Sequence, residues 1–202
     1  MPARAGLGAE IVDLGGGLGI QYVEGRVPPS ISEFVGTVVW HVNAQWRLLG
    51  VPSPQLVLEP GRSIVGRAGI TLYKVGAIKE VADSTTYVAV DGGMSDNPRP
   101  QLYQAEYTGL LANRASESPD GTYVICGKHC ESGDVMIRDL RLPEPRRGDL
   151  LAVPATGAYT LTMASNYNLV PRPAAVLVGD GKVKLIRRRE TIEDLLDLEP
   201  VA

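Results

Sequence analysis

The sequence predicts an α/β region in residues 1–69 followed by a domain of mostly antiparallel β-strands in residues 70–202. Two observations support this division. The first sixty residues follow the order strand, helix, strand, which is typical of a βαβ unit with parallel strands. From about residue 70 onward the apolar runs become short, and no long helical pattern separates most of them.

The α/β region begins with a predicted strand over residues 10–14, which runs into a glycine-rich turn over residues 15–19. The predicted helix begins after Ser30, which forms a capping box with Glu33, and it ends at Gly50. A second strand is predicted over residues 55–58. Apolar residues repeat at helical spacing along the helix, so we expect one of its faces to be buried. The repeating residues are Ile31, Phe34, Val35, Val38, Val39, Val42, Trp46 and Leu49.

Short strands and turns make up the second region. A last helix is predicted over residues 191–198, with Thr191 as its cap and Asp194 near its amino end. Turns are predicted over residues 117–121 and 143–148, where breakers cluster. The predicted strands cover residues 70–78, 86–90, 122–126, 150–153, 174–178 and 183–186.

Composition limits the classes of partner. The chain has 202 residues, 44% of them hydrophobic, and a formal net charge of -3, so we expect a globular core and neither nucleic acid nor a membrane as partner. Two cysteines are too few for the disulfide framework of a secreted domain, and no apolar run has the length of a signal peptide core or membrane span. We expect a soluble cytoplasmic protein with reduced thiols.

The carboxyl ends of the two parallel strands lie at one edge of the sheet, where α/β folds and barrels bind ligands. Gly16 and Gly17 follow the first strand and Gly61 follows the second, so their backbone N–H groups can bind a phosphate. The alternative is a flexible loop. Glu59 can pair with a cationic ring nitrogen, and Arg62 with a carboxylate or phosphate. The alternative there is a surface salt bridge between the two.

A long loop over residues 91–100 contains two glycines and two prolines, a composition typical of binding loops. Arg99 and Tyr103 are four residues apart, so a helical turn places both on one side, within reach of a substrate carboxylate. The alternative is a solvated arginine and a half-buried tyrosine. Tyr159, in a loop of small residues after a strand, can donate to a phosphate or stack near a ring. Ordinary aromatic packing is its alternative.

Residues 127–134 bring a thiol, an imidazole, an ammonium and two carboxylates together between two strands. Lys128 or His129 beside Cys130 favours the thiolate and could make Cys130 a proton donor or a nucleophile. Zinc is the competing hypothesis, but Cys126 and Cys130 have no second ligand pair at the usual spacing, so we expect no metal. Cys126 alternates within an apolar strand, which favours a buried structural cysteine.

Six motifs in this order resemble the diaminopimelate decarboxylase family, within the alanine-racemase-like, fold-type III pyridoxal-phosphate enzymes. The resemblance runs from about Glu10 to Leu196. The fourth and sixth motifs favour this family over the related ornithine and arginine decarboxylases. The motifs are Gly-Gly-Gly-Leu-Gly, Glu-Pro-Gly-Arg-Ser, Val-Asp-Gly-Gly-Met-Ser-Asp-Asn-Pro-Arg-Pro, Cys-Glu-Ser-Gly-Asp, Gly-Ala-Tyr and Ser-Asn-Tyr-Asn.

The resemblance implies a fold, a cofactor and a set of site residues. Residues 1–69 would be the last part of a (β/α)8 barrel, and residues 70–202 a carboxy-terminal β-barrel or sandwich. The cofactor implied is pyridoxal 5'-phosphate, and Cys130 would return a proton to the α-carbon after carbon dioxide leaves. The cofactor-binding residues implied are Gly16, Gly17, Glu59, Gly61, Arg62 and Tyr159. The substrate-binding residues implied are Arg62, Arg99, Tyr103, Glu131 and Tyr159.

The implied reaction is the decarboxylation of meso-2,6-diaminopimelate to L-lysine. The implied working unit is a homodimer in which the segment around Cys130 reaches the partner's active site. The family's cofactor-bonding lysine lies upstream of the glycine turn, and no lysine precedes Gly15 in this sequence. We therefore expect the chain alone to be inactive, with a missing amino-terminal half. The alternatives are a non-catalytic dimerisation or binding module or remnant, and another fold-type III decarboxylase of the ornithine or arginine type.

Overall fold

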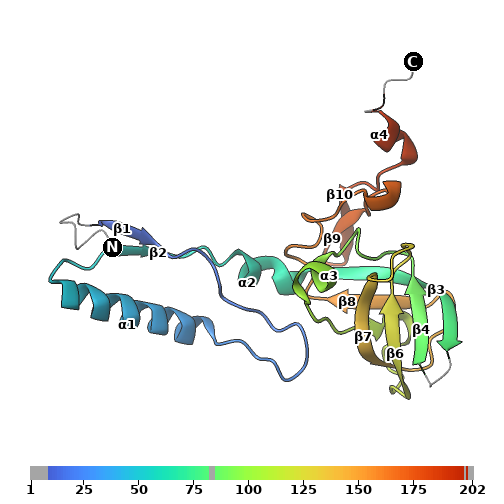
Figure 1. Cartoon of the computed structure of the whole chain (residues 1–202), viewed down its shortest axis with the longest axis horizontal. Coiled ribbons are helices and arrows are strands. Elements are labelled where there is room, and N and C mark those ends of the chain that lie inside the picture. The colour runs from blue at the N-terminus through green and yellow to red at the C-terminus, as the bar shows by residue number, and fades with distance from the viewer. Residues whose placement is uncertain (1–8, 82–84, 198, 200–202) are drawn as a thin grey trace.

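The structure is a computed structural model that describes residues 9–81, 85–197 and 199 (Figure 1). A βαβ unit lies at one end of the molecule and a six-stranded sheet at the other, with the short helix α2 (Gly61–Val65) between them. The predicted order of an α/β region followed by a mostly antiparallel β region is confirmed. Residue 198, the end of the last predicted helix, lies outside the described residues.

The βαβ unit consists of β1 (Ile11–Asp13), α1 (Ile31–Leu49) and β2 (Gln55–Val57). The two strands pair in parallel, as predicted. The capping box is also confirmed, because the Glu33 N–H donates to Ser30 Oγ at 3.2 Å and the Ser30 N–H donates to Glu33 Oε2 at 2.8 Å. Gly50 ends the helix with φ 66°, a left-handed conformation that glycine adopts without strain.

The expectation that α1 has a buried face is wrong for this structure. No residue of α1 is buried, and Trp40 is 65% exposed. Most of the predicted apolar stripe, including Phe34, Val38 and Val42, is only half-buried. The physical reason is that the two short strands of β1 and β2 form too small a sheet to cover a helix of 19 residues.

The six-stranded sheet has the order β5-β8-β3-β4-β6-β7. Its neighbours are antiparallel except for β4 and β6, which are parallel. The curled sheet encloses the core, in which Val88, Ile125 and Leu151 have no exposed surface. The sequence pattern did not predict β5 or β7. The strands are β3 (Ile70–Val81), β4 (Thr85–Val90), β5 (Leu110–Leu111), β6 (Gly121–Cys126), β7 (Val135–Leu142) and β8 (Leu150–Pro154).

The remaining elements connect or follow the sheet. The hairpin of β9 (Ala175–Gly179) and β10 (Lys182–Arg187) precedes α4 (Ile192–Leu196), which begins after the predicted cap Thr191. Thr191 forms a capping box with Asp194. Short helical turns are α3 (Arg99–Tyr103), η2 (Gly66–Ala68), η3 (Ala112–Arg114) and η4 (Tyr167–Leu169). Within the described ranges, every helix is too short or too polar to cross a membrane.

Candidate functional site

The glycine-rich turn and the Glu-Pro-Gly-Arg turn lie against each other at the carboxyl ends of β1 and β2. The Glu59 N–H donates to the Gly15 carbonyl oxygen at 2.8 Å. A Cβ added at Gly16 would lie 2.7 Å from the Glu59 carbonyl oxygen, so only glycine allows this approach. Gly17 has φ 100°, which side chains rarely adopt. Both turns therefore belong to one edge of the sheet, as the strand order predicts.

A third loop joins this edge from the six-stranded sheet. The Gly157 N–H donates to the Gly66 carbonyl oxygen at 3.0 Å, which docks the end of β8 against η2. As a result the Arg62 Cζ atom lies 5.5 Å from the centre of the Tyr159 ring, within cation–π distance. Tyr159 is 46% exposed, so it is not an ordinarily packed aromatic residue. No ion pair joins Arg62 to Glu59 within the part of the chain that the structure describes.

Arg99 and Tyr103 occupy the two ends of α3, and both line a cavity of about 280 Å³. Arg99 is only 7% exposed, so the alternative of a solvated arginine is wrong. Its Nη1 atom donates to Tyr107 Oη at 2.6 Å, and its Cζ atom lies 4.8 Å from the centre of the Tyr22 ring. Tyr103 is 64% exposed rather than half-buried. The sequence reasoning did not identify Tyr22 or Tyr107.

The loop of residues 127–134 is attached to the loop of residues 91–97 through one buried carboxylate. Asp134 is 3% exposed, and its side chain accepts the Met94 N–H at 2.7 Å and the His129 N–H at 3.0 Å. A Cβ added at Gly127 would lie 2.5 Å from the Asp134 Cγ atom. The glycine therefore lets the carboxylate reach both loops, and the loop carrying Cys130 has a defined position.

His129 adds a second link that sequence reasoning missed. Its Nε2 atom lies 2.8 Å from Ser95 Oγ, and its ring lies 5.3 Å from the Tyr167 ring. The Ser165 N–H donates to the Ser95 carbonyl oxygen at 2.9 Å. Three loops, which carry the third, fourth and sixth motifs, thus meet at Ser95. In the sequence, only the occurrence of these motifs in family order indicated that the three loops could belong to one site.

The two cysteines differ in their surroundings. Cys130 is exposed, whereas Cys126 is half-buried, and burial followed by the nearby Asp134 carboxylate raises the pKa of the Cys126 thiol. Glu131 is exposed and accepts the Gly133 N–H at 3.3 Å. Over residues 9–81 and 85–197, Cys130 and Glu131 make no hydrogen bond or ion pair with Arg62. Neither residue lines the cavity at Arg99.

Two other side chains in the loop of residues 91–97 are buried with their polar groups. Burial raises the pKa of Asp96, whose carboxylate accepts the Gly93 N–H at 3.0 Å. Asn97 has no exposed surface, and its side-chain amide has no hydrogen-bond partner among the residues that the structure describes. The described part of the chain has no cluster of three or more His, Cys, Asp or Glu side chains arranged to hold a metal.

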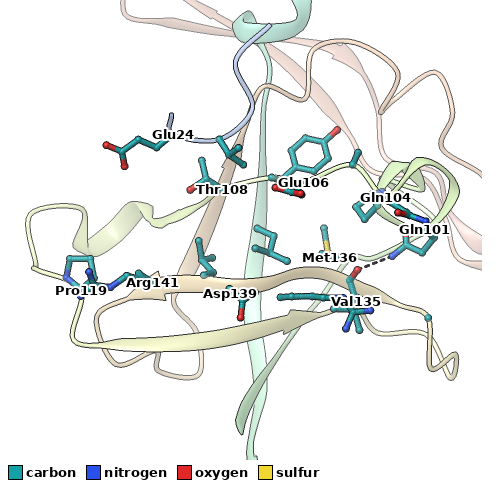
Figure 2. A pocket seen from close by; sticks show the side chains of 18 residues that line it. Glu24, Gln101, Gln104, Glu106, Thr108, Pro119, Val135, Met136, Asp139 and Arg141 are labelled. Carbon is teal, nitrogen blue, oxygen red and sulfur yellow. Dashed lines mark hydrogen bonds between the residues drawn. The ribbon is translucent and has the colours of Figure 1, made fainter. Parts of the chain in front are cut away.

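A larger groove of about 1080 Å³ runs beside β7 (Figure 2). Glu106 and Thr108 line one side, while Val135 and Asp139 come from β7 on the other. Gln101 closes one end by donating from Nε2 to the Val135 carbonyl oxygen at 3.2 Å. None of the predicted site residues lines this groove, but it adjoins the cavity at Arg99, because Val23, Gln104, Ala105 and Glu106 line both.

Comparison with known proteins gives concordant matches. The family model for pyridoxal-dependent decarboxylase, C-terminal sheet domain, matches residues 17–157. The diaminopimelate decarboxylase of Halalkalibacterium halodurans is 49% identical over 194 residues, which are 96% of this chain and 44% of that protein. That of Bacillus subtilis is 50% identical over 191 residues, which are 95% of this chain and 44% of that protein.

A solved structure extends the likeness to three dimensions. Diaminopimelate decarboxylase from M. jannaschii, in co-complex with L-lysine, has a TM-score of 0.86 and 38% sequence identity. The match covers 98% of this chain and 45% of that chain. The present chain therefore spans less than half the length of the relatives that it matches.

Proposed function

Because this chain belongs to the pyridoxal-dependent decarboxylases and carries their C-terminal sheet domain, we propose that it is the carboxy-terminal part of a diaminopimelate decarboxylase. The reaction proposed is the conversion of meso-2,6-diaminopimelate to L-lysine and carbon dioxide. The names of the relatives and their identities near 50% support this substrate over ornithine or arginine. We place the boundary between the barrel segment and the β domain at residues 69 and 70, a division that the family match spans.

The observation that supports this proposal best is the meeting of three loops at one edge. The glycine turn touches the Glu-Pro-Gly-Arg turn, and Arg62 lies over Tyr159 from a third loop. The close approach at Gly16, which a Cβ would block, suits a phosphate cradled by backbone. The residues present therefore fit pyridoxal 5'-phosphate, which when bound supplies an electron sink for the electrons of the broken carbon–carbon bond.

The chain's own residues would orient the cofactor. Gly16, Gly17 and Gly61 would offer backbone N–H groups to the phosphate, and Tyr159 would donate its hydroxyl there. Glu59 would face the ring nitrogen, where a carboxylate keeps a proton on that atom. Arg62, which lies over the Tyr159 ring, would offer positive charge to the phosphate or to a substrate carboxylate. These assignments rest on the resemblance to the family, and the residue types and the shared edge support them.

Substrate binding would use the carboxylates and amines of a diamino diacid. Arg99 and Tyr103 line one cavity, where a guanidinium fork and a hydroxyl can hold a carboxylate. Glu131 offers an anion to an ammonium group. Arg62 and Tyr159 would complete the substrate's surroundings.

Cys130 would supply the proton that replaces carbon dioxide on the α-carbon. Its thiol is exposed on a loop that Asp134 and His129 hold in place. Cys130 and Glu131 lie away from the cavity at Arg99, which supports a homodimer in which this loop enters the other subunit's site. We also propose that the enzyme acts in the cytoplasm, where thiols such as those of Cys126 and Cys130 stay reduced.

The proposal is tested by reconstitution. The chain is mixed with a separately expressed amino-terminal portion of a relative, and carbon dioxide release from meso-diaminopimelate is measured with pyridoxal phosphate present. We expect release from the mixture, none from either part alone, and a large loss with Cys130→Ala. A folded mixture that releases no carbon dioxide would favour the non-catalytic module, and faster release from ornithine or arginine would favour the other decarboxylase class.

A further inference from the structure

Arg99 is a buried cation without an anionic partner. It is 7% exposed, yet no ion pair joins it to a carboxylate in the described ranges 9–81 and 85–197. A buried charge without a counter-charge is unfavourable, so an anionic ligand that binds to it removes an energetic cost. Arg99 lines a cavity of about 280 Å³, in which such an anionic ligand could bind.

Two tyrosines fix the guanidinium from different directions. Tyr107, which is 4% exposed, accepts a hydrogen bond from Nη1 at 2.6 Å and so fixes one end of the guanidinium plane. The Tyr22 ring lies under the guanidinium, with its centre 4.8 Å from Cζ. The two rings contact each other edge to face, with centres 5.3 Å apart and an angle of 82°. The guanidinium therefore has little freedom to rotate.

The charge of the cavity wall also favours an anion. Among the described residues that line it, Glu106 is the only carboxylate, and it is paired with Arg26 at 3.0 Å. Arg99 is left as the uncompensated charge, and the Tyr103 side chain lies on the same wall. A guanidinium fork matches a carboxylate with two parallel hydrogen bonds, provided that the fork is held still.

We propose that Tyr22 and Tyr107 are positioning residues that hold the Arg99 guanidinium ready for the ligand carboxylate that is not released. This inference rests on the proposed function and deepens it. One carboxylate of meso-diaminopimelate leaves as carbon dioxide, while the other remains in L-lysine. The Arg99 cavity would bind the one that remains, so L-lysine should bind there, and cadaverine, which has no carboxylate, should not.

The test follows the Arg99 side-chain N–H signals by NMR in the isotope-labelled 202-residue chain during titration with L-lysine or cadaverine. In the wild-type chain we expect L-lysine to shift these signals and cadaverine to leave them unchanged. Tyr107→Phe keeps the ring but loses the hydrogen bond, and should weaken L-lysine binding roughly tenfold while speeding rotation of the Nη groups. Tyr22→Leu, which loses the ring face, should weaken L-lysine binding several-fold, whereas Tyr22→Phe should not.

Tyr87→Phe on β4 is the matched control, because Tyr87 lies outside the cavity wall. The inference is overturned if L-lysine fails to shift the wild-type signals, or if Tyr107→Phe binds L-lysine as tightly as the control. It is also overturned if the tyrosine variants change lysine affinity without changing Arg99 rotation. Carbon dioxide release by the reconstituted enzyme is measured separately, so failure of the proposed function and failure of this inference are distinguishable.

Discussion

Gly157 is the position where a single methyl group should separate the two regions of the chain. A Cβ added there would lie 2.9 Å from the Val65 carbonyl carbon and from the Gly69 N atom, and closer still to the Val65 carbonyl oxygen. All three atoms belong to the backbone, so no side chain can move aside. Gly157→Ala therefore requires the loop after β8 to withdraw from η2.

The magnitude follows from what this withdrawal breaks. Two hydrogen bonds of 3.0 Å join the loop to η2 and its end, from Thr156 to Gly69 and from Gly157 to Gly66. Each contributes about 1 kcal/mol, and overpacking adds about 1–3 kcal/mol. We expect Gly157→Ala to lower the free energy of unfolding by about 3–5 kcal/mol, which at a urea m-value of about 3 kcal/mol/M shifts the urea midpoint by about 1–2 M.

The assay is urea unfolding monitored by circular dichroism, with Gly179→Ala as the matched control. Gly179 lies at the end of β9, and a Cβ added there meets nothing within contact distance. We expect this control to unfold near the wild-type midpoint. Equal midpoints for the two variants would refute the reasoning, because they would mean that the loop does not touch η2.

Two further predictions use titrating groups. The hydrogen bond from Arg172 at 2.6 Å leads the causes that lower the pKa of Glu190 to about 2, so the wild type should lose stability as the pH falls from about 4.5 to about 2. Thermal melts should show this loss, and Glu190→Gln should show a smaller one, since other paired carboxylates such as Asp194 still titrate; an unchanged profile in the variant would contradict the pairing. Iodoacetamide should modify the exposed Cys130 at least roughly tenfold faster than Cys126, whose raised pKa leaves less thiolate. Peptide mass spectrometry measures both rates, and equal rates would disprove the assigned burial.

Local sequence signals predicted local structure well. The capping box at Ser30 and Glu33 is a contact between residues three apart, so the residue types alone reveal it. The parallel pairing of β1 and β2 followed from the order of elements. β7 escaped prediction because Arg138 and Asp139 stand side by side and interrupt its alternation of apolar and polar residues.

Contacts between distant residues set the limit of prediction for the site. The bond from Met94 to Asp134 spans 40 residues, and that between His129 and Ser95 spans 34. No periodicity relates such pairs, so the motifs indicated which residues matter but not which of them touch. The placement of Arg99 between two tyrosines was unpredictable for the same reason, since Tyr22 lies far from Arg99 in the sequence, in the segment that follows the glycine turn.

The way in which the Cys130 loop is held bears on how a second subunit could use it. Within this loop, Asp134 and His129 make short contacts with Met94 and Ser95 of the neighbouring loop, and Asp134 also accepts the His129 N–H. The Cys130 thiol itself is exposed. A segment that is already ordered loses little conformational entropy when it enters another protein. A flexible loop would have to be ordered at the moment of association, which would weaken the dimer. The buried carboxylate of Asp134 thus supports the proposal that Cys130 acts across a subunit interface, because it fixes the position of the thiol before the partner arrives.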